Sequence, residues 1–148
     1  MPFSRKYFPG TNFILTRVHG CIDDAQLLDH VRSLNAEARE WRAAREVADC
    51  RDLGDISRLT VQGTTEAARL EKGQPRCIGG RLAIVVPEGG AAFGMGRAYA
   101  SVAELARGHA IVTLSLSESL RWLGFPEAEL TALEDLINAE RPRKEGAV

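Results

Sequence analysis

The sequence predicts an α/β fold: a mainly parallel five-stranded sheet with an antiparallel N-terminal strand, helices on both faces and an extra C-terminal helix. Strand-like and helix-like segments alternate along the chain, and such alternation favours parallel pairing through right-handed crossovers. The unbroken apolar run at 82–86 is typical of a strand that is covered on both faces. A length of 148 residues with 45% hydrophobic content suits a single core.

The first third of the chain predicts a hairpin followed by a capped helix. Strand-like segments at 5–8 and 13–19 flank a turn at 9–12. Asp23 and Gln26 match a capping box, and the apolar positions that follow predict a helix reaching Trp41. A short strand is expected at 47–48, and the polar residues at 49–52 are expected to end it.

The remaining elements follow the same alternation. A helix is expected from Thr60, its N-cap, to about Lys72, weakened by Gly63. Strands at 81–86 and 110–114 enclose a helix whose apolar positions span 92–106 and which Gly108 ends. A short helix over 117–123 ends at Gly124.

We expect residues 1–125 to form the α/β domain and residues 126–148 to form an amphipathic helix and a tail. The apolar stripe of this helix consists of Leu130, Leu133, Leu136 and Ile137, and a stripe of that kind must be covered. Either the sheet of the same chain or a second subunit, in a homodimer, could cover it.

Composition excludes several classes of function. Nineteen basic and twenty acidic residues leave no strong positive field for nucleic-acid binding. The apolar runs are far shorter than the roughly 20 residues of a membrane span, and the N-terminus lacks the apolar core of a signal peptide, so we expect a cytoplasmic protein. Three cysteines and three histidines, without metal-ligand or disulfide spacing, predict reduced thiols, no metal and no cofactor.

Three stretches resemble the SpoIIAA-like, STAS-type small bacterial proteins: VADCRDL at 47–53, PEGGAAFGMGRAY at 87–99 and SESLRWLGF at 117–125. In many such proteins the third strand runs into an Asp, Arg, Asp sequence, and the helix after the fourth begins with an aromatic-Gly pair followed by Arg and Tyr. The matching positions here are Asp49, Arg51, Asp52, Phe93, Gly94, Arg97 and Tyr99. The resemblance covers about residues 6–125 and implies a SpoIIAA-like fold.

STAS domains of the anti-sigma-factor-antagonist kind carry a phosphorylatable serine in an Asp-Ser-Ser-Gly sequence after the third strand. This chain has Gly-Asp-Ile-Ser-Arg-Leu-Thr there instead, which leaves Ser57 and Thr60 as candidate phosphorylation sites. A phosphate near a helix N-terminus would be stabilised by the helix dipole. The structural alternative is that Thr60 simply caps the helix.

The glycine-rich stretch at 89–97 is the strongest candidate for a ligand site. It follows a strand and opens a helix, where backbone amides can bind an anion, which makes Gly90 and Gly94 candidate ligand contacts. Neither the phosphate-loop nor the dinucleotide pattern is satisfied, because no Lys-Ser or Lys-Thr follows Gly94 and Tyr99 replaces the third glycine. Alternatively, the glycines allow close packing and Arg97 pairs with a carboxylate such as Asp52.

Three functions follow from these observations. The first is a noncatalytic regulatory or binding module that holds a small ligand or a protein partner, in accordance with the resemblance and with the lack of a catalytic motif. The second is a small-molecule or lipid carrier, which requires an apolar pocket. The third is an enzyme that uses a rim formed by Asp49, Asp52 and Arg97, which requires these side chains to converge in a cleft.

Overall fold

The computed structural model of the chain describes residues 2–141. Its sheet has five strands, β1 (Phe3–Phe8), β2 (Phe13–Gly20), β3 (Arg45–Leu53), β4 (Arg81–Val85) and β5 (His109–Thr113), in the spatial order β1-β2-β3-β4-β5. β1 pairs antiparallel with β2 across a short 3-10 turn, and every other pair is parallel. The predicted fold class is confirmed, including the antiparallel N-terminal strand.

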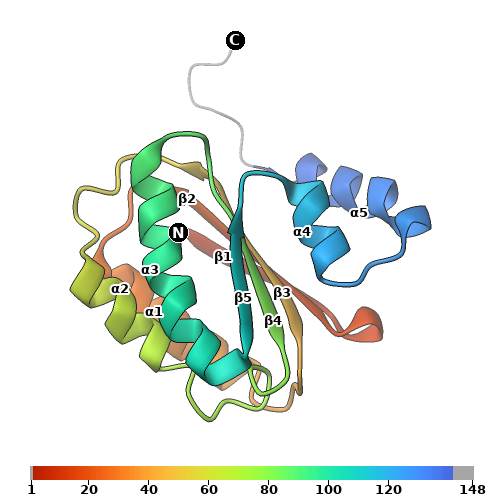
Figure 1. The fold of residues 1–148 in the computed structure, drawn as a ribbon, viewed down its shortest axis with the longest axis horizontal. Helices are drawn as coiled ribbons and strands as arrows, with labels where there is room; N and C mark the ends of the chain where they lie inside the picture. The colour runs from red at the N-terminus through yellow and green to blue at the C-terminus, as the bar shows by residue number, and fades with distance from the viewer. Residues whose placement is uncertain (1, 142–148) are drawn as a thin grey trace.

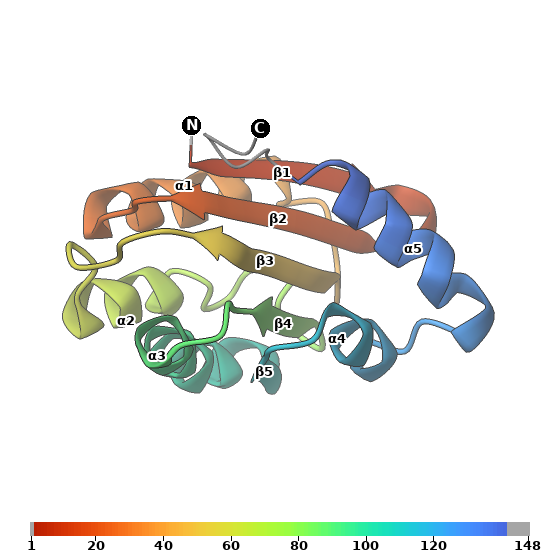
Figure 2. The same cartoon turned by 90° about the horizontal axis from the view of Figure 1, so that it is seen from above.

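Helices cover both faces of this sheet (Figures 1 and 2). One face carries α1 (Asp24–Glu37), α2 (Val61–Arg69) and α3 (Gly90–Arg107), and the other carries α4 (Leu116–Trp122) and α5 (Glu127–Ala139). The crossovers put the helices there because parallel strands must be joined over a face of the sheet. Among the described residues, no helix combines the length and apolarity needed to cross a bilayer.

Alternating side chains of the strands build a separate core on each face. Under α1, α2 and α3 lie Val18, Cys50, Leu82 and Ile84, together with Leu27 and Val31 of α1. Under α4 and α5 lie Phe13, Leu15, Val47, Ala83 and Val85, together with Leu120, Leu130 and Ile137. β4 contributes side chains to both cores, which explains why its residues 82–85 are all apolar.

Two predicted boundaries are wrong. α1 ends at Glu37 rather than near Trp41, and the Trp41 ring packs against Tyr7 with ring centroids 5.6 Å apart. β3 does not end at Ala48 but continues to Leu53, because β2 is long enough to pair with it up to Gly20. Residues 49–52 therefore belong to the strand, and a register shift beside them changes the alternation of side chains.

The C-terminal helix docks on its own chain. Leu130 and Ile137 are 4% and 0% exposed in the core under α4 and α5, and the guanidinium of Arg17 donates a hydrogen bond to the Ile137 carbonyl. Leu130, Leu133 and Ile137 of the predicted apolar stripe therefore pack within the chain, whereas Leu136 is 40% exposed. The tail predicted after this helix falls, from residue 142 onward, outside the described residues.

Candidate functional site

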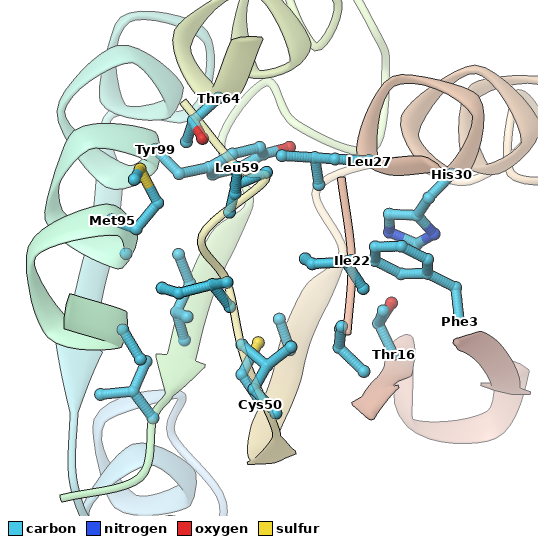
Figure 3. Close-up of a pocket in the computed structure, with 18 of the residues that line it drawn as sticks. Phe3, Thr16, Ile22, Leu27, His30, Cys50, Leu59, Thr64, Met95 and Tyr99 are labelled. Atoms are coloured by element: carbon cyan, nitrogen blue, oxygen red, sulfur yellow. The ribbon is translucent and has the colours of Figure 1, made fainter. Parts of the chain in front are cut away.

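A cavity lies between the sheet and α1, α2 and α3 (Figure 3). It has about 90 Å³ of free volume, and its walls are mostly apolar. The strands leave this space because the residues that face it from the middle of β3, Ala48 and Cys50, are small. The apolar lining consists of Phe3, Val18, Ile22, Leu27, Ala48, Cys50, Leu53, Ile56, Leu59, Leu82, Ile84, Val86, Ala92, Met95 and Gly96.

Thr16, His30, Glu46, Thr64 and Tyr99 add a small number of polar groups to this lining. Figure 3 shows that they come from different elements, with Thr16 on the sheet, His30 on α1, Thr64 on α2 and Tyr99 on α3. Apolar walls with a few convergent polar groups are typical of small-molecule sites.

Three of these groups, Thr16, Glu46 and Tyr99, belong to a buried ionic network. Arg107 donates to Glu71 at 2.6 Å and to Glu46 at 2.9 Å, and the Tyr99 hydroxyl donates to the other oxygen of Glu71 at 2.5 Å. Thr16 donates to Glu46 at 3.3 Å. Glu46, Glu71 and Arg107 are each at most 4% exposed in their side chains, so the network is buried and forms part of the cavity wall through Thr16, Glu46 and Tyr99.

Burial and the neighbouring charges in this network shift the pKa values of Glu71, Arg107 and Tyr99. Burial raises the pKa of Glu71, but the Arg107 guanidinium outweighs this effect and holds that pKa below its usual value. Burial lowers the pKa of Arg107, whereas Glu71 and Glu46 raise it well above its usual value. Burial and the Glu71 carboxylate raise the pKa of Tyr99 well above its usual value, so its phenol remains a donor.

His30 lines the cavity as a neutral ring. Its pKa is lowered to about 3, mainly by burial and then by the positive charge of Arg5. Arg5 donates to Nδ1 at 2.9 Å, and because a guanidinium has no acceptor, the proton of the neutral ring is on Nε2. The ring also stacks on Phe3, with centroids 4.4 Å apart.

Thr64 is the unusual residue of the lining. It is 1% exposed, and its hydroxyl oxygen is buried without a hydrogen-bond partner among residues 2–141. Figure 3 shows the side chain reaching inward from α2 beside Tyr99. A buried hydroxyl without a partner costs free energy, so a ligand group that hydrogen-bonds to Thr64 would remove this cost.

The predicted Asp-Arg-Asp rim is a set of ion pairs under α5. Arg51 binds both oxygens of Asp49 at 2.8 and 2.9 Å and also donates to Asn138 at 2.9 Å. Arg141 binds Asp52 through two hydrogen bonds of 3.0 and 2.7 Å. The hydrogen bonds from Arg51 to Asn138 and from Arg141 to Asp52 connect the C-terminal end of α5 to β3.

The glycine-rich stretch does not join that rim. Arg97 is exposed on α3, which covers the opposite face of the sheet from α5, so the proposed pairing of Arg97 with Asp52 is wrong and the suggested catalytic rim is not assembled. A Cβ at Gly90 or Gly94 would meet only open space, and Phe93 is 37% exposed. Tyr99 is the residue of this stretch that reaches the polar network.

The two candidate phosphorylation sites have structural roles. Thr60 is the N-cap of α2, accepting from the Gly63 amide at 2.9 Å, and its hydroxyl donates to Asp24 at 2.6 Å. Ser57 donates to Asp55 from both its amide and its hydroxyl, each at 2.9 Å, in the loop before α2. The capping role predicted for Thr60 is confirmed.

Sequence reasoning missed Thr64, Glu46, Glu71 and Arg107. A signal existed for two of them, because Glu46 begins the apolar half of β3 and Arg107 ends a helix rich in small apolar residues. Charged residues in such positions are buried in pairs when they are buried at all. Nothing local marks Thr64 or Glu71, since only the packing of α2 against α3 places them inside.

The chain matches no protein-family model and no curated protein. Among solved structures it is similar to an uncharacterised protein of the DUF3478 family from Shewanella loihica PV-4, which is described as having a SpoIIAA-like fold. The alignment covers 82% of this chain and 91% of that chain, with 13% identity and a TM-score of 0.50. At this identity the likeness concerns architecture alone, and it agrees with the sheet order and helix placement above: the chain has a SpoIIAA-like fold.

Proposed function

We propose that this protein is a noncatalytic binding module that holds a small, mostly apolar molecule in the cavity between the sheet and α1, α2 and α3. The observation that carries the proposal is the cavity itself, which has about 90 Å³ of free volume inside the main core. The walls of this cavity are mostly apolar, and apolar cavities bind apolar guests. Of the functions considered from the sequence, this is closest to the small-molecule carrier.

The size of the cavity limits the ligand. An engineered cavity of roughly 150 Å³ binds benzene, so a guest of that size needs local adjustment here. Three lining residues favour adjustment: Met95 has a flexible side chain, and Ile56 and Leu59 lie in the loop between β3 and α2. A guest that contacts this loop also fixes its position, which is the physical basis for a regulatory role.

The chemistry of the lining supports binding without catalysis. Glu46 is held by Arg107 and Thr16, and Tyr99 is held by Glu71. His30 stays neutral because its pKa is about 3. A general acid or base must exchange a proton near the working pH, whereas the pKa of His30 lies well below that pH and the pKa of Tyr99 well above it.

The test is methyl NMR with xenon and toluene as probes. We expect both to shift the methyl signals of Ile22, Ile56 and Ile84, which face the cavity, and to leave those of Ile14 and Ile137 unchanged, because the latter lie in other clusters. Shifts of equal size at all five isoleucines, or no saturable shift at any of them, would contradict the proposal.

A filled cavity provides the matched comparison. Ala48→Leu places a larger side chain on the cavity floor, and we expect it to abolish toluene binding with a change in stability of less than about 1.5 kcal/mol, because the space already exists. Ala132→Leu makes the same substitution on the exposed side of α5 and should leave binding intact. Equal toluene affinity in the two variants would place the site elsewhere.

A further inference from the structure

The polar groups of the cavity restrict the charge of its ligand. Of the five polar side chains in the lining, Glu46 carries a formal charge and is already paired with Arg107 at 2.9 Å. His30 is neutral, with a pKa of about 3, and Tyr99 keeps its proton. The lining therefore offers no free cation to an anionic guest, and a cationic guest would have to displace Arg107 from a buried pair.

Thr64 supplies the one fully buried side-chain polar atom of the lining that has no hydrogen-bond partner among residues 2–141. Its hydroxyl is buried and unpartnered within the described chain, although a threonine in a helix can usually donate to the carbonyl one turn earlier. In α2 that carbonyl, of Thr60, accepts from the Thr64 amide at 2.9 Å. The Thr64 hydroxyl can donate to an oxygen or accept from a hydroxyl, and it lines the cavity beside Tyr99 (Figure 3).

We infer that the cavity binds an uncharged, predominantly apolar molecule carrying one hydroxyl or carbonyl group, which hydrogen-bonds to Thr64 at the α2–α3 side. This inference rests on the proposed function and narrows it, because it excludes fatty-acid carboxylates and amines, whose charges would be buried without a partner. The remainder of the guest contacts the apolar walls formed by residues such as Leu59, Ile84 and Met95.

Four ring compounds of similar size separate the possibilities: toluene, phenol, benzoate and benzylammonium. Phenol replaces the methyl group of toluene by a hydroxyl, which costs affinity in a wholly apolar cavity and is compensated only by a polar partner. We expect phenol to bind at least as tightly as toluene at pH 7, and both ions to bind at least about 100-fold more weakly. The measurement is the titration of the Ile22, Ile56 and Ile84 methyl signals.

Two threonine variants test the anchor. Thr64→Val keeps the shape and removes the hydroxyl, so we expect phenol to lose about tenfold or more in affinity while toluene changes less than about twofold. Because this hydroxyl has no hydrogen-bond partner in the described part of the chain, the ligand-free variant should be no less stable than the parent protein. Thr16→Val removes the other threonine hydroxyl of the lining, which is bound to Glu46, and should keep the preference for phenol.

The possible outcomes distinguish this inference from the proposed function. If toluene and xenon fail to bind, the cavity is not a ligand site and both fail. If toluene binds but benzoate or benzylammonium binds more tightly than phenol, the neutral ligand class is overturned while the cavity remains a binding site. The hydrogen bond to Thr64 is overturned, again without loss of the binding site, if Thr64→Val leaves the phenol affinity unchanged or if only Thr16→Val reduces it.

Discussion

At the scale of single residues, the buried ring of His30 in the cavity wall makes the free energy of unfolding depend on pH. Its folded-state pKa is about 3, below the ordinary value of 6.5, so the unfolded chain gains a proton as the pH falls through 6.5 while the folded protein does not. The contribution of His30 to the free energy of unfolding is fully present above pH 6.5 and is lost progressively as the pH falls towards 3. Between pH 6.5 and 5 the loss amounts to at most about 2 kcal/mol.

His30→Gln removes this titration and retains an oxygen that can accept from Arg5. Urea unfolding at pH 7 and pH 5 should therefore show a smaller stability loss for His30→Gln than for the parent protein, by up to about 2 kcal/mol. His109→Gln changes an exposed histidine at the start of β5 and is the matched control, which should lose as much as the parent protein. An unchanged loss in His30→Gln would contradict the burial of a neutral ring.

At the scale of elements, the missing side chain of Gly63 allows α2 to approach Asp24 of α1 closely. A Cβ at this position would lie 2.1 Å from the carboxyl carbon of Asp24, whose two oxygens accept from the amide and hydroxyl of Thr60. The sequence marks Gly63 as a weak point of its helix, and in isolation it is one. The contact with Asp24, which the sequence does not reveal, explains why a glycine is needed.

Gly63→Ala should therefore destabilise the protein by about 1–2 kcal/mol, although alanine is ordinarily the better helix former. Gly94→Ala is the matched comparison in α3, because a Cβ there meets nothing within 4 Å, and it should stabilise the protein by about 0.5–1 kcal/mol. Thermal unfolding of both variants checks the two signs. A stabilising Gly63→Ala would show that Asp24 moves without cost.

The elements predicted from the sequence were those whose signals are local. The capping box at Asp23, the glycine that ends α3 at Gly108 and the apolar run of β4 each depend on neighbours in the sequence. The end of β3 could not be predicted, because the length of β2 decides where their pairing stops. The candidate site escaped prediction for the same reason, since Thr64, Glu46 and His30 meet only after two crossovers bring their elements together.

At the scale of the whole molecule, the two faces of the sheet have different roles. One face contains the cavity, whereas the other is covered by α4 and α5, and the end of α5 is held by the Arg51–Asn138 hydrogen bond and the Arg141–Asp52 ion pair. The residues Asp49, Arg51 and Asp52 therefore have a structural use: Arg51 and Asp52 attach the C-terminal helix to the sheet, and Asp49 orients Arg51. This division predicts that α5 contributes to the stability of the sheet.

Two neighbouring residues of α5 test this contribution. Ile137 is 0% exposed and contacts the core, whereas Leu136 beside it is 40% exposed. Ile137→Ala should lower the free energy of unfolding by about 2–5 kcal/mol through lost burial and the resulting cavity, and Leu136→Ala should change it by less than about 1 kcal/mol. Urea unfolding is followed by the fluorescence of Trp41, which packs against a different core cluster, with all variants made in a Trp122→Phe background so that Trp41 is the reporter. If Ile137→Ala frees α5 from the sheet but leaves the Trp41 transition in place, the helix is an independent appendage; a single shifted transition shows that it is an integral layer of the fold.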